Sequence, residues 1–261
     1  ARVGQLLSGL MTNARPRPSS VAHYWNLEAE TVYLNHGSFG AFPKAVLKAQ
    51  DEHRARVERE AVRWFVTELD GEYDRAREPV ARLIGAKASD VVFVPNATHG
   101  VTAVLMSVCM AGQLGPGDEV LVTSHEYLAC MNNLRRLAGM WGFAIVTATL
   151  PPFPIGSMEE VAEAVTKKIS CRTKLALISH VTSPSGLVLP VELMLPALQR
   201  AGVRVLLDGA HGAGFVPLDM GKWERMGVTW YTTNCHKWLC APKGSAVLWT
   251  KASEQWVTRP A

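Results

Sequence analysis

The chain has 261 residues, of which 48% are hydrophobic and 19% charged, and its formal net charge is +4 at pH 7. This composition excludes a disordered or fibrous protein, and no uncharged apolar run reaches the ~18 residues that a membrane-spanning helix needs. The basic residues are scattered along the chain, so neither a nucleic acid nor a membrane is expected as a partner.

The first thirty residues are expected to form an N-terminal arm. Residues 1–20 contain three arginines and no acidic residue, which is typical of a mobile arm and also of the remnant of an import sequence. The chain has five cysteines, an odd number, and most of them lie in apolar segments. Reduced thiols in the cytoplasm are therefore expected, with import into an organelle as the alternative.

The next segments predict a loop and a long helix. The segment Asn35–Gly40 is polar and flanked by glycine, so it either lets a ligand approach its backbone closely or forms a simple turn. A helix is predicted to begin near Pro43, because proline suits a first helical turn. Val57, Ala61 and the pair Trp64–Phe65 have the spacing of one helical face, which predicts a single amphipathic helix through this region.

Short apolar runs then alternate with helical stretches to the end of the chain. Several runs are apolar at every position, which is typical of strands buried on both faces of a parallel sheet. We therefore predict an α/β fold, a three-layer αβα sandwich with a mainly parallel sheet, in a domain that covers residues 31–261. The predicted strands are Val91–Val94, Val120–Thr123, Ala144–Thr147, Leu175–Ser179, Val203–Leu207, Val228–Thr233 and Ala246–Trp249.

Polar residues with chemical capability follow the predicted strands. In α/β folds ligands bind at the carboxyl ends of the strands, so these side chains are expected to gather at one edge of the sheet. They are Asn96, Thr98, His99, Ser124, His125, Glu126, Tyr127, His180, Thr182, Ser183, Asp208, His211, Asn234, His236 and Lys237.

Three of these positions have a functional interpretation and a simpler alternative. Asp208 ends an apolar strand, where a carboxylate needs a cation or hydrogen-bond donors, unless it only caps a helix at about 1 kcal/mol. Lys237 lies among apolar and aromatic residues, where desolvation makes an amine nucleophilic, unless it extends to the surface. Thr98 begins a helix whose N–H groups either bind a phosphate or are simply capped.

Two other classes of site are disfavoured by the sequence. The glycines of segment 209–214 follow the order G-x-x-G-x-G, not the G-x-G-x-x-G order of a dinucleotide-binding oxidoreductase. Cys235, His236 and Cys240 match no usual zinc spacing, so no metal is expected.

Six segments, taken together and in order, resemble the class V aminotransferase family of fold-type I enzymes. These enzymes use pyridoxal 5′-phosphate (PLP), and the likeness is strongest to the isopenicillin N epimerase-like branch. The resemblance extends from about residue 31 to residue 250. Its segments are Leu34–Ala41, Asn96–Val101, Ser124–Tyr127, His180–Gly186, Asp208–His211 and Asn234–Gly244.

The resemblance implies a role for each site residue. The catalytic residues would be Lys237, which binds the cofactor covalently, Asp208, which pairs with the pyridine nitrogen, and Tyr127, which stacks on the ring. The remaining cofactor-binding residues fall into two groups. Thr98, His99, Asn234 and His236 resemble phosphate ligands, and Ser183 and His211 match positions toward the phenolic oxygen of the ring.

The family likeness also implies a function and a partner. The expected activity is epimerase-like chemistry at the α-carbon of an amino acid or amino-acid-like side chain, in a homodimer. A carbon–sulfur lyase or cysteine desulfurase-like enzyme is the alternative, as is an inactive fragment that retains the fold. Epimerisation needs a second acid, for which His36 is a candidate. Relatives continue into a small C-terminal domain, which is expected to be absent or truncated here because residue 261 follows Lys237 by only 24 positions.

Overall fold

A seven-stranded sheet forms the centre of the protein in the computed structural model, which describes residues 17–260. The strands follow the order β1-β7-β6-β5-β4-β2-β3. β7 is antiparallel to both of its neighbours and the other pairs are parallel, as predicted for a mainly parallel sheet. The strands are β1 (Val91–Val94), β2 (Glu119–Thr123), β3 (Ala144–Ala148), β4 (Thr173–Ser179), β5 (Arg204–Asp208), β6 (Val228–Asn234) and β7 (Ala246–Thr250).

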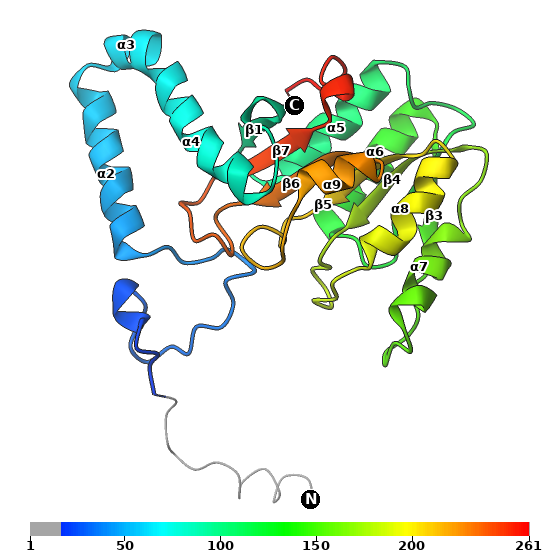
Figure 1. Ribbon diagram of the computed structural model, residues 1–261, viewed down its shortest axis with the longest axis horizontal. Coiled ribbons are helices and arrows are strands. Elements are labelled where there is room, and N and C mark those ends of the chain that lie inside the picture. Colours follow the sequence, from blue (N-terminus) through cyan, green and yellow to red (C-terminus); the bar gives the residue numbers. More distant parts are fainter. Residues whose placement is uncertain (1–16, 261) are drawn as a thin grey trace, which may run out of the picture.

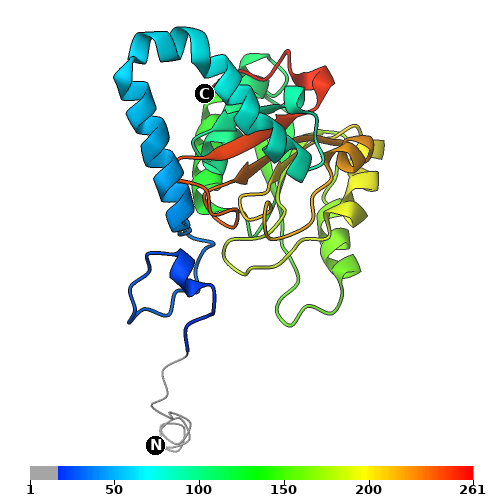
Figure 2. The same ribbon diagram turned by 60° about the vertical axis from the view of Figure 1, so that its left-hand side comes forward.

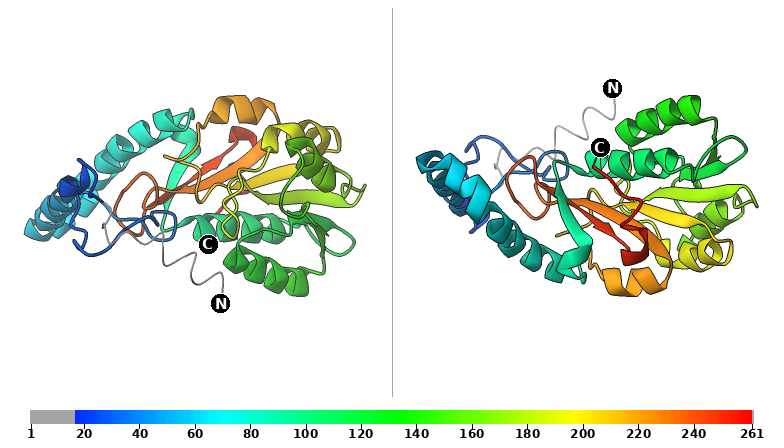
Figure 3. Two further views of the ribbon diagram at one scale, coloured as in Figure 1. Left: turned by 90° about the horizontal axis from the view of Figure 1, so that it is seen from below. Right: turned by 90° about the horizontal axis from the view of Figure 1, so that it is seen from above.

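Helices cover both faces of this sheet, which confirms the three-layer arrangement (Figure 3). One face packs against α5 (Ala97–Met110) and α6 (Leu128–Trp141). The other face packs against α4 (Leu69–Leu83), α7 (Met158–Thr166), α8 (Val191–Arg200) and α9 (Met220–Arg225). Short 3-10 turns complete the chain: η1 (Ala22–Tyr24), η3 (Ala88–Asp90) and η4 (Ala252–Glu254).

The strands are rich in apolar residues on both faces because they contribute to both cores. In β4, Leu175 and Leu177 face α5 and α6, whereas Ala176 and Ile178 face the opposite layer. Successive side chains of a strand point to opposite faces, so a strand covered on both sides needs apolar residues throughout. Each fully buried leucine or isoleucine contributes about 1.5–3 kcal/mol, and this fixes the register of the strands on which the site is built.

The prediction of a single long amphipathic helix after Pro43 is wrong. α2 (Lys44–Arg59) ends at Glu60, whose backbone is extended with φ −158° and ψ 74°. The Glu60 carboxylate accepts the N–H of Arg63 and caps the next helical segment. α3 (Ala61–Arg63) and the π-helical turn η2 (Trp64–Glu68) then lead into α4, so the chain turns back (Figures 1 and 2). Val57 therefore lies on a different helical segment from Trp64.

The N-terminal segment is partly described. Residues 17–30 are mostly exposed, and Trp25 Nε1 donates a hydrogen bond to the carbonyl of Ala41 at 3.3 Å. The first sixteen residues of the expected arm lie outside the described part of the chain, so the arm and its boundary at residue 30 stay predictions. Within residues 17–260, no helix combines the length and the apolar character needed to cross a bilayer.

Candidate active site

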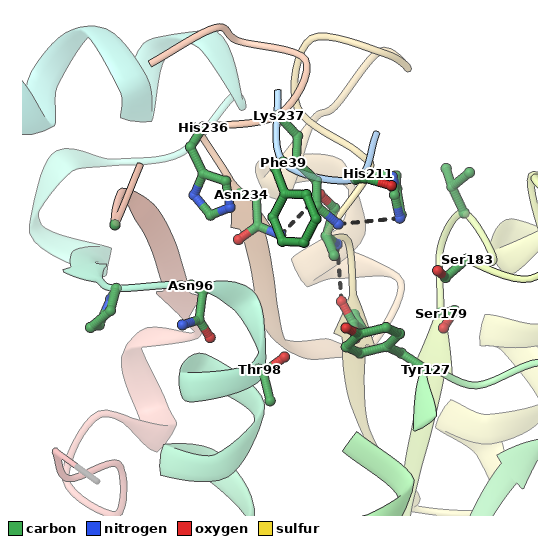
Figure 4. A pocket seen from close by; sticks show the side chains of 16 residues that line it. Phe39, Asn96, Thr98, Tyr127, Ser179, Ser183, His211, Asn234, His236 and Lys237 are labelled. Atoms are coloured by element: carbon green, nitrogen blue, oxygen red, sulfur yellow. Dashed lines mark hydrogen bonds between the residues drawn. The ribbon is translucent and has the colours of Figure 1, made fainter. Parts of the chain in front are cut away.

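A cavity of about 460 Å³ opens at the edge of the sheet where β4, β5 and β6 end. Eight of the nine predicted cofactor-binding residues line it (Figure 4): Thr98, Tyr127, Ser183, Asp208, His211, Asn234, His236 and Lys237. The other lining residues are Ser38, Phe39, Pro95, Asn96, Ser179, Val181, Ala210 and Gly244. The carboxyl ends of the parallel strands thus bring together side chains that are far apart in the sequence.

Asp208 is the last residue of β5 and is only 3% exposed. Its Oδ1 accepts the N–H of Ala210 at 2.9 Å, and its Oδ2 accepts the thiol of Cys130 at 3.4 Å. Burial raises the pKa of Asp208, whereas these two donors and the charge of Lys237 oppose the rise. The carboxyl group is therefore held rigidly at the wall of the cavity and would bind a cationic N–H favourably.

Lys237 follows β6 and reaches the cavity with a partly buried side chain. Its Nζ lies 3.3 Å from Nε2 of His211, the contact drawn as a dashed line in Figure 4. Burial lowers the pKa of Lys237, although the charge of Asp208 opposes this. Burial, with a smaller effect of Lys237, lowers the pKa of His211 to about 4. The neutral imidazole accepts a hydrogen bond from Lys237, whose amine is more easily deprotonated than a surface lysine.

The N-terminus of α5 points at the same cavity. Asn96 caps the helix by accepting the N–H of His99 at 2.8 Å, and Asn234 Oδ1 accepts the N–H of Ala97 at 2.9 Å. Within residues 17–260 the N–H of Thr98 has no hydrogen-bond partner. A helix N-terminus with an unpaired amide beside a cavity is a favourable place for a phosphate.

The predicted phosphate ligands differ in whether their side chains reach the cavity and are free to bind a phosphate. The side chain of His99 lines a separate cavity of about 430 Å³, so the fold does not bring its imidazole to the Lys237 cavity. Asn234 joins two backbone segments, because its Nδ2 also donates to the carbonyl of Ala210 at 3.4 Å. Thr98 and His236 remain the side chains at this end of the cavity that are best available to a phosphate.

His236 is oriented by the backbone. Its Nδ1–H donates to the carbonyl of Ser245 at 2.8 Å, which leaves Nε2 for another partner. Burial lowers the pKa of His236, the hydrogen bond to Ser245 opposes this, and the charges of Lys237 and Lys243 lower it further. The imidazole must therefore gain a proton on Nε2 before it can donate a hydrogen bond to an anion.

The glycine-flanked loop before α2 packs against the loop that carries Lys237. Gly40 has φ +67°, and a Cβ there would lie 2.1 Å from the carbonyl oxygen of His236. Lys243 Nζ also donates to the Gly40 carbonyl at 2.6 Å. The group that approaches this glycine closely is therefore the protein backbone. The contact brings Ser38 and Phe39 to the rim of the cavity.

Tyr127 and Ser183 reach the cavity from two further loops. Tyr127 is the N-cap residue of α6 and is 44% exposed. Its ring lies below Lys237 in Figure 4. Ser183 follows β4 and is exposed. A flat ring bound in this space could therefore lie against the Tyr127 ring.

His180 and His36 are two of the histidines singled out by the sequence that do not line the cavity. His180 follows Ser179 and points to the opposite layer, where its Nδ1 lies 3.1 Å from the hydroxyl of Tyr231. The alternation of side chains along a strand explains this, since Ser179 and Val181 line the cavity instead. The candidate second acid, His36, accepts the N–H of Ala41 at 3.4 Å and is not among the lining residues.

Three residues at the site received no role from the sequence. Ser179 lines the cavity and donates to Oε2 of Glu126 at 2.6 Å, and Glu126 Oε1 accepts the hydroxyl of Thr123 at 2.6 Å. Burial, with the neighbouring charge of Asp208, raises the pKa of Glu126 to about 7. Cys130 is the third, through its contact with Asp208. The only sequence signal for these residues was their position at or just after predicted strand ends.

Comparison with known proteins identifies the family. The family model described as Aminotransferase class-V matches residues 32–260. The chain belongs to this family. Its members are PLP-dependent enzymes, so the resemblance noted in the sequence is confirmed.

Curated class V relatives include two kinds of enzyme. An isopenicillin N epimerase from Amycolatopsis lactamdurans is 34% identical over 235 residues, covering 90% of this chain and 58% of that protein. A probable chloroplastic L-cysteine desulfhydrase from Arabidopsis thaliana is 32% identical over 231 residues, covering 84% of this chain and 48% of that protein. The chain thus spans about half the length of the curated relatives it matches.

Solved structures of low sequence identity share the fold. A variant of the protein C-DES with glycine covalently linked to its PLP cofactor matches with a TM-score of 0.79 and 22% identity. The match covers 94% of this chain and 62% of that chain. A cysteine desulfurase from Thermococcus onnurineus matches with a TM-score of 0.74 and 20% identity, over 95% of this chain and 60% of that chain.

The chemistry of the residues that line the cavity matches the parts of PLP, the cofactor of class V enzymes. A buried carboxylate, Asp208, suits a protonated pyridine nitrogen, and the amine of Lys237 suits the aldehyde. The unpaired N–H of Thr98 at the start of α5 suits the phosphate. Tyr127 offers an aromatic face for the ring.

Proposed function

We propose that this chain carries the PLP-binding part of an enzyme that acts at the α-carbon of an amino acid or an amino-acid-like side chain. The observation that carries the proposal is that Lys237 and Asp208 line one cavity at the carboxyl edge of the sheet. The pairing of an activated amine with a buried carboxylate is what PLP chemistry requires of a protein.

The roles of the residues follow from their surroundings. When bound, PLP supplies an electron sink that lowers the barrier to removing the α-proton of an amino acid. Asp208 would hold a proton on the pyridine nitrogen, since two protein donors orient its carboxylate and, with the charge of Lys237, favour its ionised form against the effect of burial on its pKa. Lys237 would hold the cofactor through its Nζ, and the same Nζ would be available to move the α-proton only after the amino group of the substrate had displaced it from the cofactor. The lowered pKa of Lys237 favours the neutral amine that both tasks need.

The remaining residues bind and orient the cofactor. Thr98 would donate its backbone N–H to the phosphate, and His236 and Asn234 would lie beside the same group. Tyr127 would offer its ring to one face of the cofactor. Ser183 and His211 would lie toward the phenolic oxygen, and the neutral His211 accepts a hydrogen bond from Lys237 on its Nε2. The N–H of His99 is hydrogen-bonded to Asn96, and its side chain lines the separate cavity.

The test is covalent trapping. The visible absorption spectrum of the purified chain with PLP is measured before and after borohydride, and the labelled peptide is mapped. We expect a visible band, permanent label on Lys237, and no band with Lys237→Ala. Lys222→Ala is the matched control, because Lys222 pairs with Glu192 on the surface and should leave the band unchanged. Label on Lys243 or on no lysine would contradict the proposal.

Two activities are candidates, and each has a relative in its favour. Epimerisation agrees with the 34% identical isopenicillin N epimerase, and carbon–sulfur cleavage agrees with the 32% identical desulfhydrase. Product analysis with chiral amino acids and with L-cysteine separates the two. Racemised substrate without sulfide or pyruvate supports the epimerase, and release of sulfide and pyruvate supports the lyase. Bound PLP with neither product identifies an inactive fragment that retains the fold.

Homodimerisation and a cytoplasmic location belong to the same proposal. The turn between α2 and α4 exposes apolar side chains, with Val62 74%, Phe65 58% and Val66 76% exposed, and a second copy would bury such a patch. All five cysteines lie in the described part of the chain and are free thiols, which agrees with a reducing compartment. Light scattering during size-exclusion chromatography tests the dimer, and a monomer at all concentrations would contradict it.

A further inference from the structure

We infer that Cys130 is a positioning residue for Asp208 and, through it, for the pyridine ring of the cofactor. The inference rests on the proposed function for its link to PLP. Cys130 belongs to the first turn of α6 and is 1% exposed. The first turn of α6 lies at the carboxyl end of β5, so Sγ of Cys130 is 3.4 Å from Oδ2 of Asp208, although the two residues are 78 positions apart in the sequence.

The direction of this hydrogen bond is fixed by the protonation of the thiol. Burial raises the pKa of Cys130, and the neighbouring Asp208 raises it further, so Cys130 is a thiol at neutral pH. The S–H is therefore the donor and the carboxylate is the acceptor. A thiolate beside Asp208 would instead repel it.

The contact completes the orientation of the carboxylate. Oδ1 is held by the N–H of Ala210 at 2.9 Å and Oδ2 by the thiol of Cys130, so rotation about the Cβ–Cγ bond would break both hydrogen bonds. Each oxygen keeps a further lone pair for the cavity side, where a cationic N–H can bind. Because a thiol is a weak donor, it fixes the direction of the carboxylate while withdrawing little of its negative charge.

Other ionisable groups around Asp208 lie on different elements. Lys237 after β6 stabilises the anion, and Glu126 before α6 and Tyr231 on β6 are buried acids whose pKa values Asp208 raises. None of these three donates a hydrogen bond to the carboxylate. In the described part of the chain, Cys130 is the side chain that makes this contact.

The first test needs no cofactor. The S–H stretching band of Cys130 is isolated by Raman difference spectra between the native chain and Cys130→Ala. We expect a band at lower frequency than that of Cys109, which is 2% exposed and whose thiol has no hydrogen-bond partner in the described structure. Asp208→Asn should move the Cys130 band upward and leave the Cys109 band in place. A Cys130 band that coincides with that of Cys109, or ignores Asp208→Asn, would overturn the inference.

The second test measures the affinity of the chain for PLP. We expect Cys130→Ala to weaken PLP binding about 5-fold, the change that a hydrogen bond of about 1 kcal/mol represents, and Cys130→Ser to restore most of the loss. Cys109→Ala is the matched control for deletion of a buried thiol and should change binding less than 2-fold. An equal loss of PLP affinity in Cys130→Ala and Cys109→Ala, or no recovery of affinity in Cys130→Ser, would show that Cys130 acts only through packing. If the native chain binds no PLP, the proposed function fails, while the Raman result still decides the contact.

Discussion

At the scale of single residues, the site depends on ionisable groups that lie away from water. Asp208, Glu126 and Lys237 have shifted pKa values because burial disfavours their charged forms. Each has hydrogen-bond or charge partners that reduce the penalty, such as Ser179 and Thr123 for Glu126. Perturbed groups of this kind cluster at functional sites, and here Asp208 and Lys237 line one cavity while Glu126 contacts its lining residue Ser179.

Glu126 should make the stability of the chain depend on pH. Its folded pKa of about 7 lies above its usual value of 4.5, so its contribution is complete below pH 4.5 and is lost as pH rises through 7. Relative to Glu126→Gln, the native chain should lose on the order of 2 kcal/mol of unfolding free energy between pH 5 and pH 8. Urea unfolding at both pH values measures this.

The control for that experiment is Glu159→Gln, because Glu159 is an exposed residue of the first turn of α7. Its curve should run parallel to that of the native chain over the same pH range. If the unfolding free energy of Glu126→Gln also changed with pH in parallel with that of the native chain, Glu126 would be ionised in the folded chain at both pH values.

His236 should couple phosphate binding to proton uptake. In the free chain, burial and two lysines lower its pKa, so the imidazole is neutral at pH 7, and a bound dianion should raise that pKa. PLP binding should therefore take up part of a proton at pH 7 and become tighter as pH falls. Calorimetry in buffers of different ionisation enthalpy measures the uptake, which His236→Gln should remove. Equal uptake by both proteins would contradict this role.

At the scale of elements, the site depends on how closely α5 lies on β6. Gly100 of α5 makes this approach possible, because a Cβ there would lie 2.4 Å from Oγ1 of Thr232. Asn234, at the end of β6, then accepts the N–H of Ala97 in the first turn of the same helix. The helix N-terminus is thereby fixed at the cavity, where it can bind an anion.

Alanine at two helical glycines should have opposite effects. Gly100→Ala should destabilise the chain by about 1–3 kcal/mol, because Thr232 cannot make room without moving α5 off β6, and PLP binding should weaken with it. Gly139→Ala on α6, where nothing lies within 4 Å of the new Cβ, should stabilise by about 0.5–1 kcal/mol. Urea unfolding of both variants measures the contrast, which changes of the same sign would refute.

At the scale of the whole molecule, one face of the sheet is covered by α5 and α6 and the other by α4, α7, α8 and α9. Both cores hold the strands in register, and the cavity lies at the edge between the two layers. A ligand that bridges the ends of β5 and β6 and the start of α5 should therefore stabilise the fold as a unit.

PLP should raise the thermal stability of the chain. At a concentration 100-fold above its dissociation constant, a ligand that binds only the folded state stabilises it by about 2.7 kcal/mol. Thermal unfolding with and without PLP measures the shift in Tm. Pyridoxal without the phosphate should give a smaller shift, because it lacks the contact with the N-terminus of α5. Equal shifts for both compounds would argue against the phosphate site.

The sequence by itself determined the class of fold and most of the cavity. Strands apolar at every position require a sheet covered on both faces, and parallel strands end at a common edge. This is why Asp208, at the end of one strand, and Asn234 and Lys237, at the end of the next, could be expected in one place, as the lining of the cavity confirms. The order of the motif segments indicated the class V family, which the family match confirms.

Only the tertiary structure decided which neighbours those residues have. The bend at Glu60, the turning of His180 toward Tyr231 and the separate cavity of His99 depend on backbone geometry that residue type does not specify. The contact between Cys130 and Asp208 depends on the tertiary arrangement that places the first turn of α6 at the end of β5. Periodicity and spacing describe one element at a time, whereas such contacts arise when elements distant in sequence pack together.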